Sequence, residues 1–509
     1  MNRISISAGA KVLAATIGVV AASVPAFTQS FRGLGDLGGG VNLSGASACS
    51  DLGLIVAGWG TTNNGVEAFF WSEPTGLGLA NSEDTDPYIS KAFAISADGS
   101  VSAGQGYNSL NQHLAFGWDF GFGGSDMGDL RGGRTWSCAY ATNWDGTIFA
   151  GEASSTNGRE AFYKTARGMK ALGDLPGGDF GSGATAMSPN GAYLAGWSFG
   201  PNGREAFTWS QRYGMAGLGD LDGGQYDSYA TGISADGMSV VGRAWSENGR
   251  EAFLWESGNG MIGLGDLPGG EYYSEALAIS SDGTWVVGWS HTDNGEEAFI
   301  WDETNGMRLL SDALTNDYGL DLTGWQLMRA TGISRDGRAI VGYGLNPGGE
   351  LEAWCATIPL PNETTFAMDS FTVVTGFNYG GDMSSFDAFD GNLFILGKDR
   401  SSAAFEFSAT APANTATQFE FATAGHATTA GLSYTLELYN WNTRRWTPVG
   451  SFNSKMSDNV QRLLVNTPDR FIEQTTNEMR GRIRMRATGR ANNTNWNASF
   501  DMIRLSLHG

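Results

Sequence analysis

The chain has 509 residues and a formal net charge of −22, with 53 acidic and 31 basic residues and 75 glycines. A surface of this sign repels nucleic acid and anionic lipid headgroups, so we expect neither as a partner. The glycines follow no collagen-like period and instead fit many tight turns between short strands.

The first residues have the pattern of a secretory signal peptide. Arg3 and Lys11 precede an apolar run from Val12 to Ala22, and small residues around Ala26 suit a signal peptidase. We expect cleavage near Ala26 and a secreted protein, extracellular or at the cell surface. The alternative is an uncleaved N-terminal anchor. No later run is long and apolar enough to predict a membrane span.

An internal repeat dominates residues 27–360. Its clearest landmark is an Ala followed by Phe or Trp, and a second landmark, an apolar-Gly-Asp-Leu run, begins at steps of 45 or 46 residues from Met127 onward. The seven Ala landmarks are Ala68, Ala115, Ala161, Ala206, Ala252, Ala298 and Ala353. Periods of this length are typical of propeller blades of four short strands.

One copy shows the strands expected in each repeat. The copy from Ser228 to Leu267 has turns at Asp236-Gly237 and Asn248-Gly249, which are strong hairpin signals between apolar runs. The fourth strand is predicted from Ile262 to Leu267. Each repeat is therefore expected to be a four-stranded antiparallel meander that must stack on its neighbours.

The ends of the repeat region complement each other. It opens on a lone fourth-strand segment, Gly33–Leu37, and its last copy stops after Glu352–Ala356 without a fourth strand. Pairing of these ends removes exposed edges. We therefore predict an all-β protein in which residues 27–360 form a seven-bladed β-propeller with cross-terminal strand closure. A β-solenoid is the alternative.

The repeats resemble a known family. The run LGDLPGGEYYSEALAISSDGTWVVGWSHTDNGEEAFIW from Leu264 to Trp301, together with Gly324–Ile333 and Ala339–Gly342, is similar to the extracellular HAF-repeat proteins of bacteria. The resemblance implies a secreted, propeller-like protein and supplies no catalytic residues. The His of the His-Ala-Phe triplet is replaced here, mostly by Glu, which removes the case for a ring of metal-binding histidines.

Residues 361–509 have a different composition, rich in Ser, Thr, Asn and Phe. Several runs alternate polar and apolar residues, which predicts a β-sandwich. The run from Leu438 to Trp446 resembles the jelly-roll modules appended to secreted bacterial proteins, which are often carbohydrate-binding-like. Charge separates the two regions as well: residues 27–360 carry 16 basic and 39 acidic residues, whereas residues 361–509 carry 13 and 14.

The sequence contains no recognisable catalytic or metal-binding motif. Its four histidines are not paired at metal-ligand spacing, and no nucleophile, zinc or phosphate-loop motif occurs. We therefore predict no cofactor and no metal. Cys49, Cys138 and Cys355 lie far apart on predicted strands; buried free thiols are expected, and a disulfide between two of them is the alternative.

The connections between repeats supply the candidate binding residues. Each follows a Gly-Gly pair, and these connections lie on the same rim as the turns between the second and third strands. The candidates are Trp136, Asp179, Phe180, Tyr226, Asp227, Glu271 and Tyr272. Aromatic faces beside acids suit sugar rings. The alternative is that these aromatics fill gaps between repeats.

A basic stripe stands out in the C-terminal region. Alternate positions of one predicted strand place four guanidinium groups on one face: Arg480, Arg482, Arg484 and Arg486. They either face solvent beside acidic cross-strand partners or dock onto the acidic repeats or an acidic polysaccharide.

The predicted function is non-catalytic recognition of a glycan or a surface or matrix protein. Export, two binding-type scaffolds and the lack of a catalytic motif favour it, although a fold does not fix a function. One alternative is a polysaccharide hydrolase or lyase that uses carboxylates at the propeller mouth. Another is a structural component of the envelope or matrix.

Overall fold

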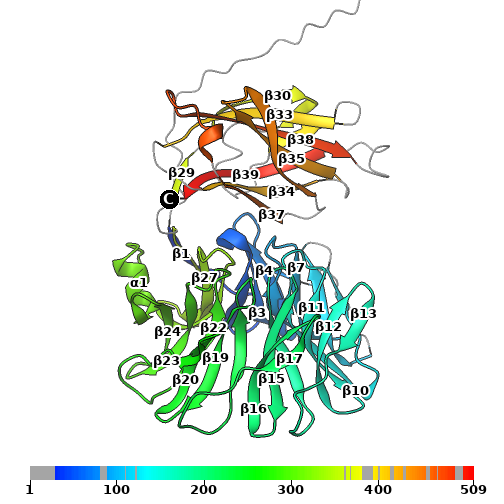
Figure 1. Ribbon diagram of the computed structural model, residues 1–509, viewed down its shortest axis with the longest axis vertical. Helices are drawn as coiled ribbons and strands as arrows, with labels where there is room; N and C mark the ends of the chain where they lie inside the picture. Colours follow the sequence, from blue (N-terminus) through cyan, green and yellow to red (C-terminus); the bar gives the residue numbers. More distant parts are fainter. Residues whose placement is uncertain are drawn as a thin grey trace, which may run out of the picture.

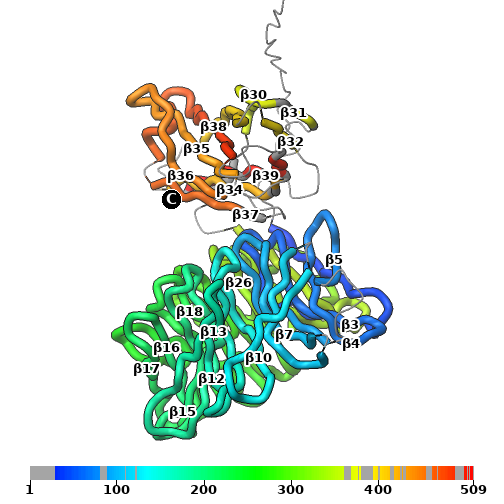
Figure 2. The backbone as a smooth tube through the Cα atoms, turned by 90° about the vertical axis from the view of Figure 1, so that its right-hand side faces the viewer, coloured from blue at the N-terminus to red at the C-terminus, as the bar shows by residue number. Residues whose placement is uncertain are grey.

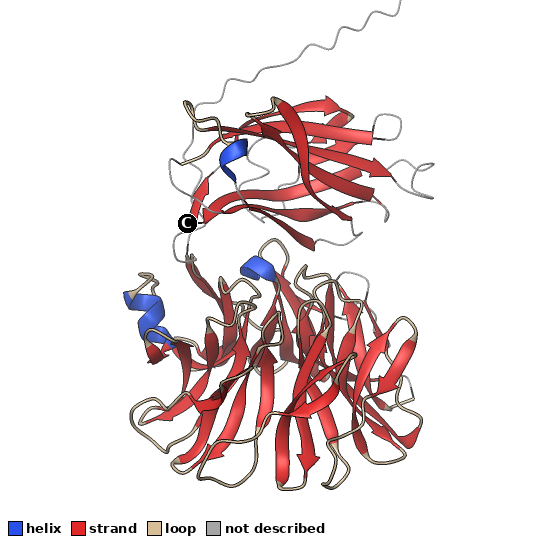
Figure 3. Ribbon diagram, in the orientation of Figure 1, coloured by secondary structure: helices blue, strands red, loops and turns tan. Residues whose placement is uncertain are grey.

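A computed structural model describes residues 29–80, 89–108, 110–120, 123–359, 363–366, 368–380, 394–398, 402–412, 418–427, 432–453, 459–466, 468–487 and 497–508. The predicted signal peptide lies outside the described residues. Nearly all regular structure is strand, which confirms the all-β prediction (Figure 3). In the part of the chain described, no helix is long and apolar enough to cross a membrane.

The repeat region, residues 30–357, consists of seven four-stranded antiparallel sheets, called units 1 to 7 here. Unit 1 comprises β2 (Ser44–Cys49), β3 (Ile55–Thr62), β4 (Gly65–Ser72) and β5 (Gly76–Leu79). Unit 2 comprises β6 (Lys91–Ile95), β7 (Val101–Tyr107), β8 (His113–Asp119) and β9 (Gly123–Asp126). Unit 3 comprises β10 (Gly132–Thr142), β11 (Phe149–Ser155), β12 (Arg159–Thr165) and β13 (Gly168–Ala171). A 3-10 turn, Asp51–Gly53, joins β2 to β3.

The remaining units follow the same order. Unit 4 comprises β14 (Ser182–Met187), β15 (Tyr193–Gly200), β16 (Gly203–Ser210) and β17 (Gly214–Gly217). Unit 5 comprises β18 (Tyr229–Ile233), β19 (Ser239–Ser246), β20 (Gly249–Glu256) and β21 (Gly260–Gly263). Unit 6 comprises β22 (Ser274–Ile279), β23 (Val286–Thr292), β24 (Gly295–Asp302) and β25 (Gly306–Leu309). Helix α1 (Leu310–Asn316) leads to unit 7, which comprises β26 (Gln326–Ile333), β27 (Ala339–Leu345), β28 (Leu351–Thr357) and β1 (Ser30–Gly33).

Each unit contacts the next, and unit 1 contacts unit 7, so the units form a closed ring, which Figure 1 shows from the side. The first strands lie innermost, where Thr185 and Thr231 donate hydrogen bonds of 2.7 Å to main-chain oxygens of the next unit. Thr331 of unit 7 donates in the same way, at 2.7 Å, to Ala46 of unit 1. This bond is the one expected if unit 1 follows unit 7.

Two segments differ from the predicted pattern. The fourth strand of unit 5 is Gly260–Gly263 instead of Ile262–Leu267, and the strand that completes unit 7 is Ser30–Gly33 instead of Gly33–Leu37. The apolar-Gly-Asp-Leu run is not a strand because side chains satisfy its backbone. Glu251 accepts the Gly265 N–H at 2.9 Å, and Gly265 has a φ of +82°.

The C-terminal region, residues 363–508, contains two further antiparallel sheets. One comprises β29 (Glu363–Phe366), β31 (Phe377–Gly380), β32 (Phe394–Gly397), β34 (Gln418–Ala427), β37 (Asn459–Asn466) and β39 (Asn497–His508); the other comprises β30 (Met368–Thr375), β33 (Ser402–Thr410), β35 (Leu432–Asn440), β36 (Arg445–Asn453) and β38 (Glu478–Ala487). A short 3-10 turn, Pro468–Phe471, also belongs to this region. Both sheets contribute to one apolar core, in which Phe405 and Phe421 are fully buried.

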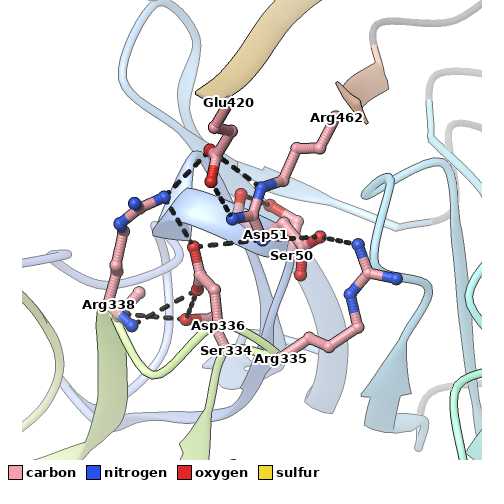
Figure 4. Close-up of polar contacts among 9 residues, drawn as sticks. Ser50, Asp51, Ser334, Arg335, Asp336, Arg338, Glu420 and Arg462 are labelled. Carbon is pink, nitrogen blue, oxygen red and sulfur yellow. Dashed lines mark hydrogen bonds and ion pairs between the residues drawn. The ribbon is translucent and has the colours of Figure 1, made fainter. Parts of the chain in front are cut away.

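The C-terminal region sits over one end of the ring in both views (Figures 1 and 2). The sheet that contains β34 and β37 faces the ring, and a buried ion cluster joins the two regions (Figure 4). Arg462 contacts Asp336 at 3.3 Å and Glu420 at 2.6 Å, and Arg338 contacts Glu420 at 3.0 Å. We call Asp51, Arg335, Asp336, Arg338, Glu420 and Arg462 the clasp.

The three cysteines are buried free thiols, as predicted. Burial raises the pKa of Cys138 and of Cys355 to about 12. Their thiol groups are therefore protonated at neutral pH, which makes them poor nucleophiles.

Candidate binding site at the open end of the ring

The ring has two different ends. Because the strands of each unit alternate in direction, the turns between first and second strands gather at one end, with those between third and fourth strands. This is the end that the C-terminal region covers, where Arg462 contacts Asp51 and Asp336. The turns between second and third strands and the connections between units gather at the opposite, open end (Figure 1).

A serine at or near the start of the first strand fixes each of units 1 to 6 to the unit before it at the open end, an interaction that we call the staple; unit 7 has Met328 in place of this serine. Ser228 accepts the Ala206 N–H at 2.9 Å and donates to the Gly219 carbonyl at 2.7 Å. Ser44, Ser137, Ser182 and Ser274 make the same two bonds. Since Ser44 of unit 1 accepts the N–H of Ala353 in unit 7, this staple also closes the ring.

A glycine in each second strand is fixed for a steric reason. A Cβ on Gly242 would lie 2.0 Å from the Tyr229 carbonyl oxygen, which no side chain tolerates. Gly58, Gly104, Gly151, Gly196, Gly288 and Gly342 face the same clash, at 1.9 to 2.2 Å. The first and second strands therefore approach closely at this point in every unit.

The positions immediately after the serine, or after Met328 in unit 7, and immediately after the glycine vary from unit to unit. We call these two sets the mouth belt. The first set is Gly45, Lys91, Cys138, Gly183, Tyr229, Glu275 and Arg329, and the second is Trp59, Gln105, Glu152, Trp197, Arg243, Trp289 and Tyr343. Within each unit, the member of the first set lies opposite the member of the second set on the adjacent strand, as Gly45 lies opposite Trp59 in unit 1.

Side chains of the mouth belt contact one another across the boundaries between units. Lys91 Nζ lies 4.7 Å from the centre of the Trp59 ring, and the Arg329 guanidinium lies 4.0 Å from that of Trp289. Tyr229 stacks on Trp197 with ring centres 6.5 Å apart. Cation–π and stacking contacts of this kind orient the aromatic rings around the mouth.

Charged groups complete the belt. Arg243 pairs with Glu275 of the next unit and lies 4.4 Å from the Tyr229 ring centre. Arg329 makes a two-pronged ion pair with Glu296, which side-chain hydrogen bonds of 2.5 and 2.7 Å define. Tyr343 and Trp59 lie edge to face, 6.4 Å apart.

Glu152 is the most buried acid of the belt, with 3% of its surface exposed. Tyr140 donates a 2.7 Å hydrogen bond to its Oε1, while Oε2 has no hydrogen-bond partner among the described residues. Burial raises the pKa of Glu152 despite the Tyr140 bond and nearby Arg159. The neighbouring belt position is Gly183, whose missing side chain leaves room for this carboxyl group.

The predicted rim residues lie at the same end, outside the belt. Trp136 stacks on His113 at 5.8 Å, and Asp227 makes a two-pronged ion pair with Arg204 at 2.7 and 2.9 Å. Arg204 also lies 5.3 Å from the Tyr229 ring, which connects the rim to the belt.

Three rim aromatics pack on the previous unit. Phe180 lies over the turn glycine Gly158, and Tyr226 and Tyr272 adjoin the equivalent Gly203 and Gly249. These three side chains are half-buried, whereas Asp179 and Glu271 are exposed. The rim therefore combines packing aromatics with exposed acids.

The basic stripe lies elsewhere. Its four arginines are on β38, in the sheet that does not face the ring, and the alternate residues Met479, Ile483 and Met485 fill the core. Arg482 pairs with Glu437 at 2.7 Å and with Glu406 at 3.3 Å. Arg480 pairs with Glu478 at 2.7 Å, and Arg484 reaches Glu437 at 3.4 Å. Arg462, not the stripe, joins the two regions.

The sequence reasoning missed the mouth belt. The signal was present as a Ser-x-Ala pattern in six units and a Gly-x pair in all seven, in which residue x differs between units. Among the described residues, no group of three or more His, Cys, Asp or Glu side chains is placed to hold a metal ion.

No family model and no curated relative matches the sequence. Similar solved structures include TolB from Acinetobacter baumannii, with 11% identity and a TM-score of 0.36 over 60% of this chain and 79% of that one. The lectin BP39L from Burkholderia pseudomallei has 6% identity and a TM-score of 0.36 over 62% and 97%. The module TmCBM61, solved with β-1,4-galactotriose, has 16% identity and a TM-score of 0.17 over 28% and 86%. Similarities at these scores carry no functional conclusion.

Proposed function

We propose that this is a secreted, non-catalytic recognition protein that binds a glycan at the mouth belt. In this proposal the ring is a seven-bladed β-propeller of the HAF-repeat type, and the C-terminal region is a jelly-roll-like β-sandwich. The observation that carries the proposal is the contrast between a constant frame and variable side chains at the open end.

That contrast separates recognition from packing. The staple serine recurs in six units and the clash-limited glycine in all seven, because these residues fix neighbouring units and neighbouring strands to one another. The belt positions between them have no common packing requirement, since they include Gly, Lys, Glu, Arg, Cys, Tyr and Trp. A surface whose chemistry varies on a rigid frame suits a ligand without internal sevenfold symmetry.

The chemistry of the belt favours a neutral or amino-sugar glycan. Half-buried Trp59, Tyr229 and Tyr343 offer aromatic surface for sugar rings, and Gln105 offers hydrogen-bonding groups for hydroxyls. The strong net negative charge of residues 27–360 opposes binding of polyanions.

A glycan array read for both retention and cleavage tests the proposal. We expect the wild-type protein to retain neutral or amino-sugar glycans, and Trp59→Ala or Tyr343→Ala to weaken binding at least tenfold. Tyr213→Ala is the matched control, because Tyr213 is 74% exposed and is not a belt residue. Retention that survives both belt substitutions, or no retention at all, contradicts the proposal.

One observation favours an enzyme as the second candidate. Glu152 has the raised pKa of a potential general acid, with Tyr140 beside it. If the array shows cleavage products that disappear in Glu152→Gln, the protein is a polysaccharide hydrolase or lyase. If the array shows neither retention nor cleavage products, the result favours a structural role in an envelope or matrix.

A further inference from the structure

The covered end of the ring contains a cavity of 790 Å³, which we call the chamber. All seven units line it through the turn between their first and second strands, so it lies on the ring axis. Residues of β34 and β37, including Gln418 and Leu464, line it from the C-terminal region. Its volume falls within the range of roughly 300 to 1,000 Å³ typical of small-molecule sites.

The floor of the chamber has a constant main chain and variable side chains. Each turn reads Ser-x-Asp-Gly or a close variant, and x is Asp51, Ala97, Trp144, Pro189, Ala235, Ser281 and Arg335 in units 1 to 7. The N–H of x donates to the carbonyl of the next x at 2.8 Å for Trp144 and 2.9 Å for Ala235 and Ser281. These links hold the floor rigid, as the staples do at the open end.

The clasp occupies one side of the chamber and balances its own charge (Figure 4). Three arginines meet three carboxylates, and the side chains of Arg338 and Glu420 are almost completely buried. Although burial opposes it, Arg462 and Arg338 lower the pKa of Asp336. This side therefore offers a ligand little unbalanced charge.

The rest of the chamber presents mostly neutral groups, together with the carboxylates of Asp98 and Asp282. Trp144 is 43% exposed and Leu464 is 56% exposed, although large apolar side chains are usually covered. Asn190, Ser281 and Gln418 add amide and hydroxyl groups to the same lining. An exposed indole among neutral hydrogen-bonding groups suits one face of a sugar ring and its hydroxyls.

We propose that the chamber is a second ligand site, separate from the mouth belt, which binds a neutral mono- or disaccharide against Trp144. The C-terminal region forms its roof, and the clasp holds that roof at one side. The site depends on neither the belt nor the basic stripe.

Titration of the full chain with a panel of neutral mono- and disaccharides, by calorimetry and indole fluorescence, tests this site. In the Trp59→Ala background, where the mouth belt is impaired, we expect saccharide binding to persist. Adding Trp144→Ala should weaken it at least tenfold, and adding Tyr213→Ala, another exposed aromatic, should not change it.

Two results would overturn the proposal. One is wild-type affinity in Trp144→Ala, and the other is the lack of any saccharide binding at millimolar concentration in the Trp59→Ala background. Circular dichroism and melting temperature check that Trp144→Ala keeps its fold, which the exposure of Trp144 leads us to expect. Loss of binding through Trp59→Ala alone would place the ligand at the belt and exclude the chamber.

Discussion

The repeat region and the C-terminal region are both built from antiparallel sheets, but their cores differ. In the ring, each pair of neighbouring units buries its own small apolar cluster, such as the one that contains Val241 and Phe299. In the C-terminal region, one large cluster joins both sheets and includes Phe394, Phe405 and Phe500. The ring therefore relies more on repeated polar bonds between units, whereas the C-terminal region relies on one continuous core.

The difference also explains where variation is possible. The ring fixes its geometry through staples, glycines and main-chain links, so side chains at its two ends are released from packing. The outward face of the C-terminal region is instead tied up in cross-strand ion pairs such as Arg482 with Glu437. The side chains of the proposed recognition sites accordingly lie mostly on the ring.

The strongest way to break the link between the two regions is Arg462→Ala. This side chain is 9% exposed and contacts three carboxylates, so its removal leaves buried negative charge. We expect a loss of about 3–5 kcal/mol in the free energy of unfolding. Urea unfolding followed by tryptophan fluorescence should also separate into two transitions.

The matched control is Arg484→Ala. Arg484 is 41% exposed and, among the residues that the structure describes, makes one ion pair, at 3.4 Å. Exposed pairs contribute up to about 1 kcal/mol, so its unfolding curve should remain close to that of the wild type. Equal effects of the two substitutions would mean that the clasp does not hold the regions together.

Ser228→Ala sharpens the argument that the ring depends on polar staples. The substitution leaves the buried Ala206 N–H and Gly219 carbonyl without their partner. We expect a loss of about 1–3 kcal/mol, measured as the shift in the urea midpoint. Ser408→Ala removes an exposed bond to Ser370 and should cost less than about 0.5 kcal/mol.

The smallest expected effect concerns pH and Asp220, which anchors the connection from unit 4 to unit 5. Burial raises its pKa to about 6 from 3.8, despite main-chain hydrogen bonds from Asp227 and Leu221. The folded chain therefore binds more protons than the unfolded chain between about pH 4 and pH 6. Stability from this group falls as pH rises through that window.

Asp220→Asn removes the carboxyl group that ionises, so it should remove this pH dependence and raise stability above pH 6. Since solvent screens a half-buried group, we expect a gain of about 1 kcal/mol. The substituted amide keeps an oxygen that accepts the Asp227 N–H. Urea midpoints at pH 4, 5, 6 and 7 measure the effect. Parallel pH profiles for the two proteins would contradict it.

The sequence predicted the repeat, its hairpin turns and the pairing of its ends, because glycine turns and alternating strands are local patterns. It misplaced the fourth strand by a few residues. The apolar-Gly-Asp-Leu run looks strand-like, yet Glu251 from the third strand binds the backbone at Gly265, a contact between distant residues.

The candidate sites were harder to predict for the same reason. The rim was inferred from topology, but Lys91 meets Trp59 only because neighbouring units lie side by side. The chamber needs the C-terminal region as a roof, and the position of Glu420 over the ring has no local signature. A comparison of variable positions within the repeat would have found both sets of residues.

The pairing of β1 with β28 has a consequence for biosynthesis. Ser30 pairs with Thr357, so a strand that is made first waits for a partner made more than three hundred residues later. A chain that leaves the ribosome or crosses a membrane from its N-terminus therefore cannot complete the ring until the last repeat has followed. Until then β1 has no partner, and it would fit the open β28 edge of another molecule whose ring has not yet closed, so crowding of unfinished chains favours strand exchange between them.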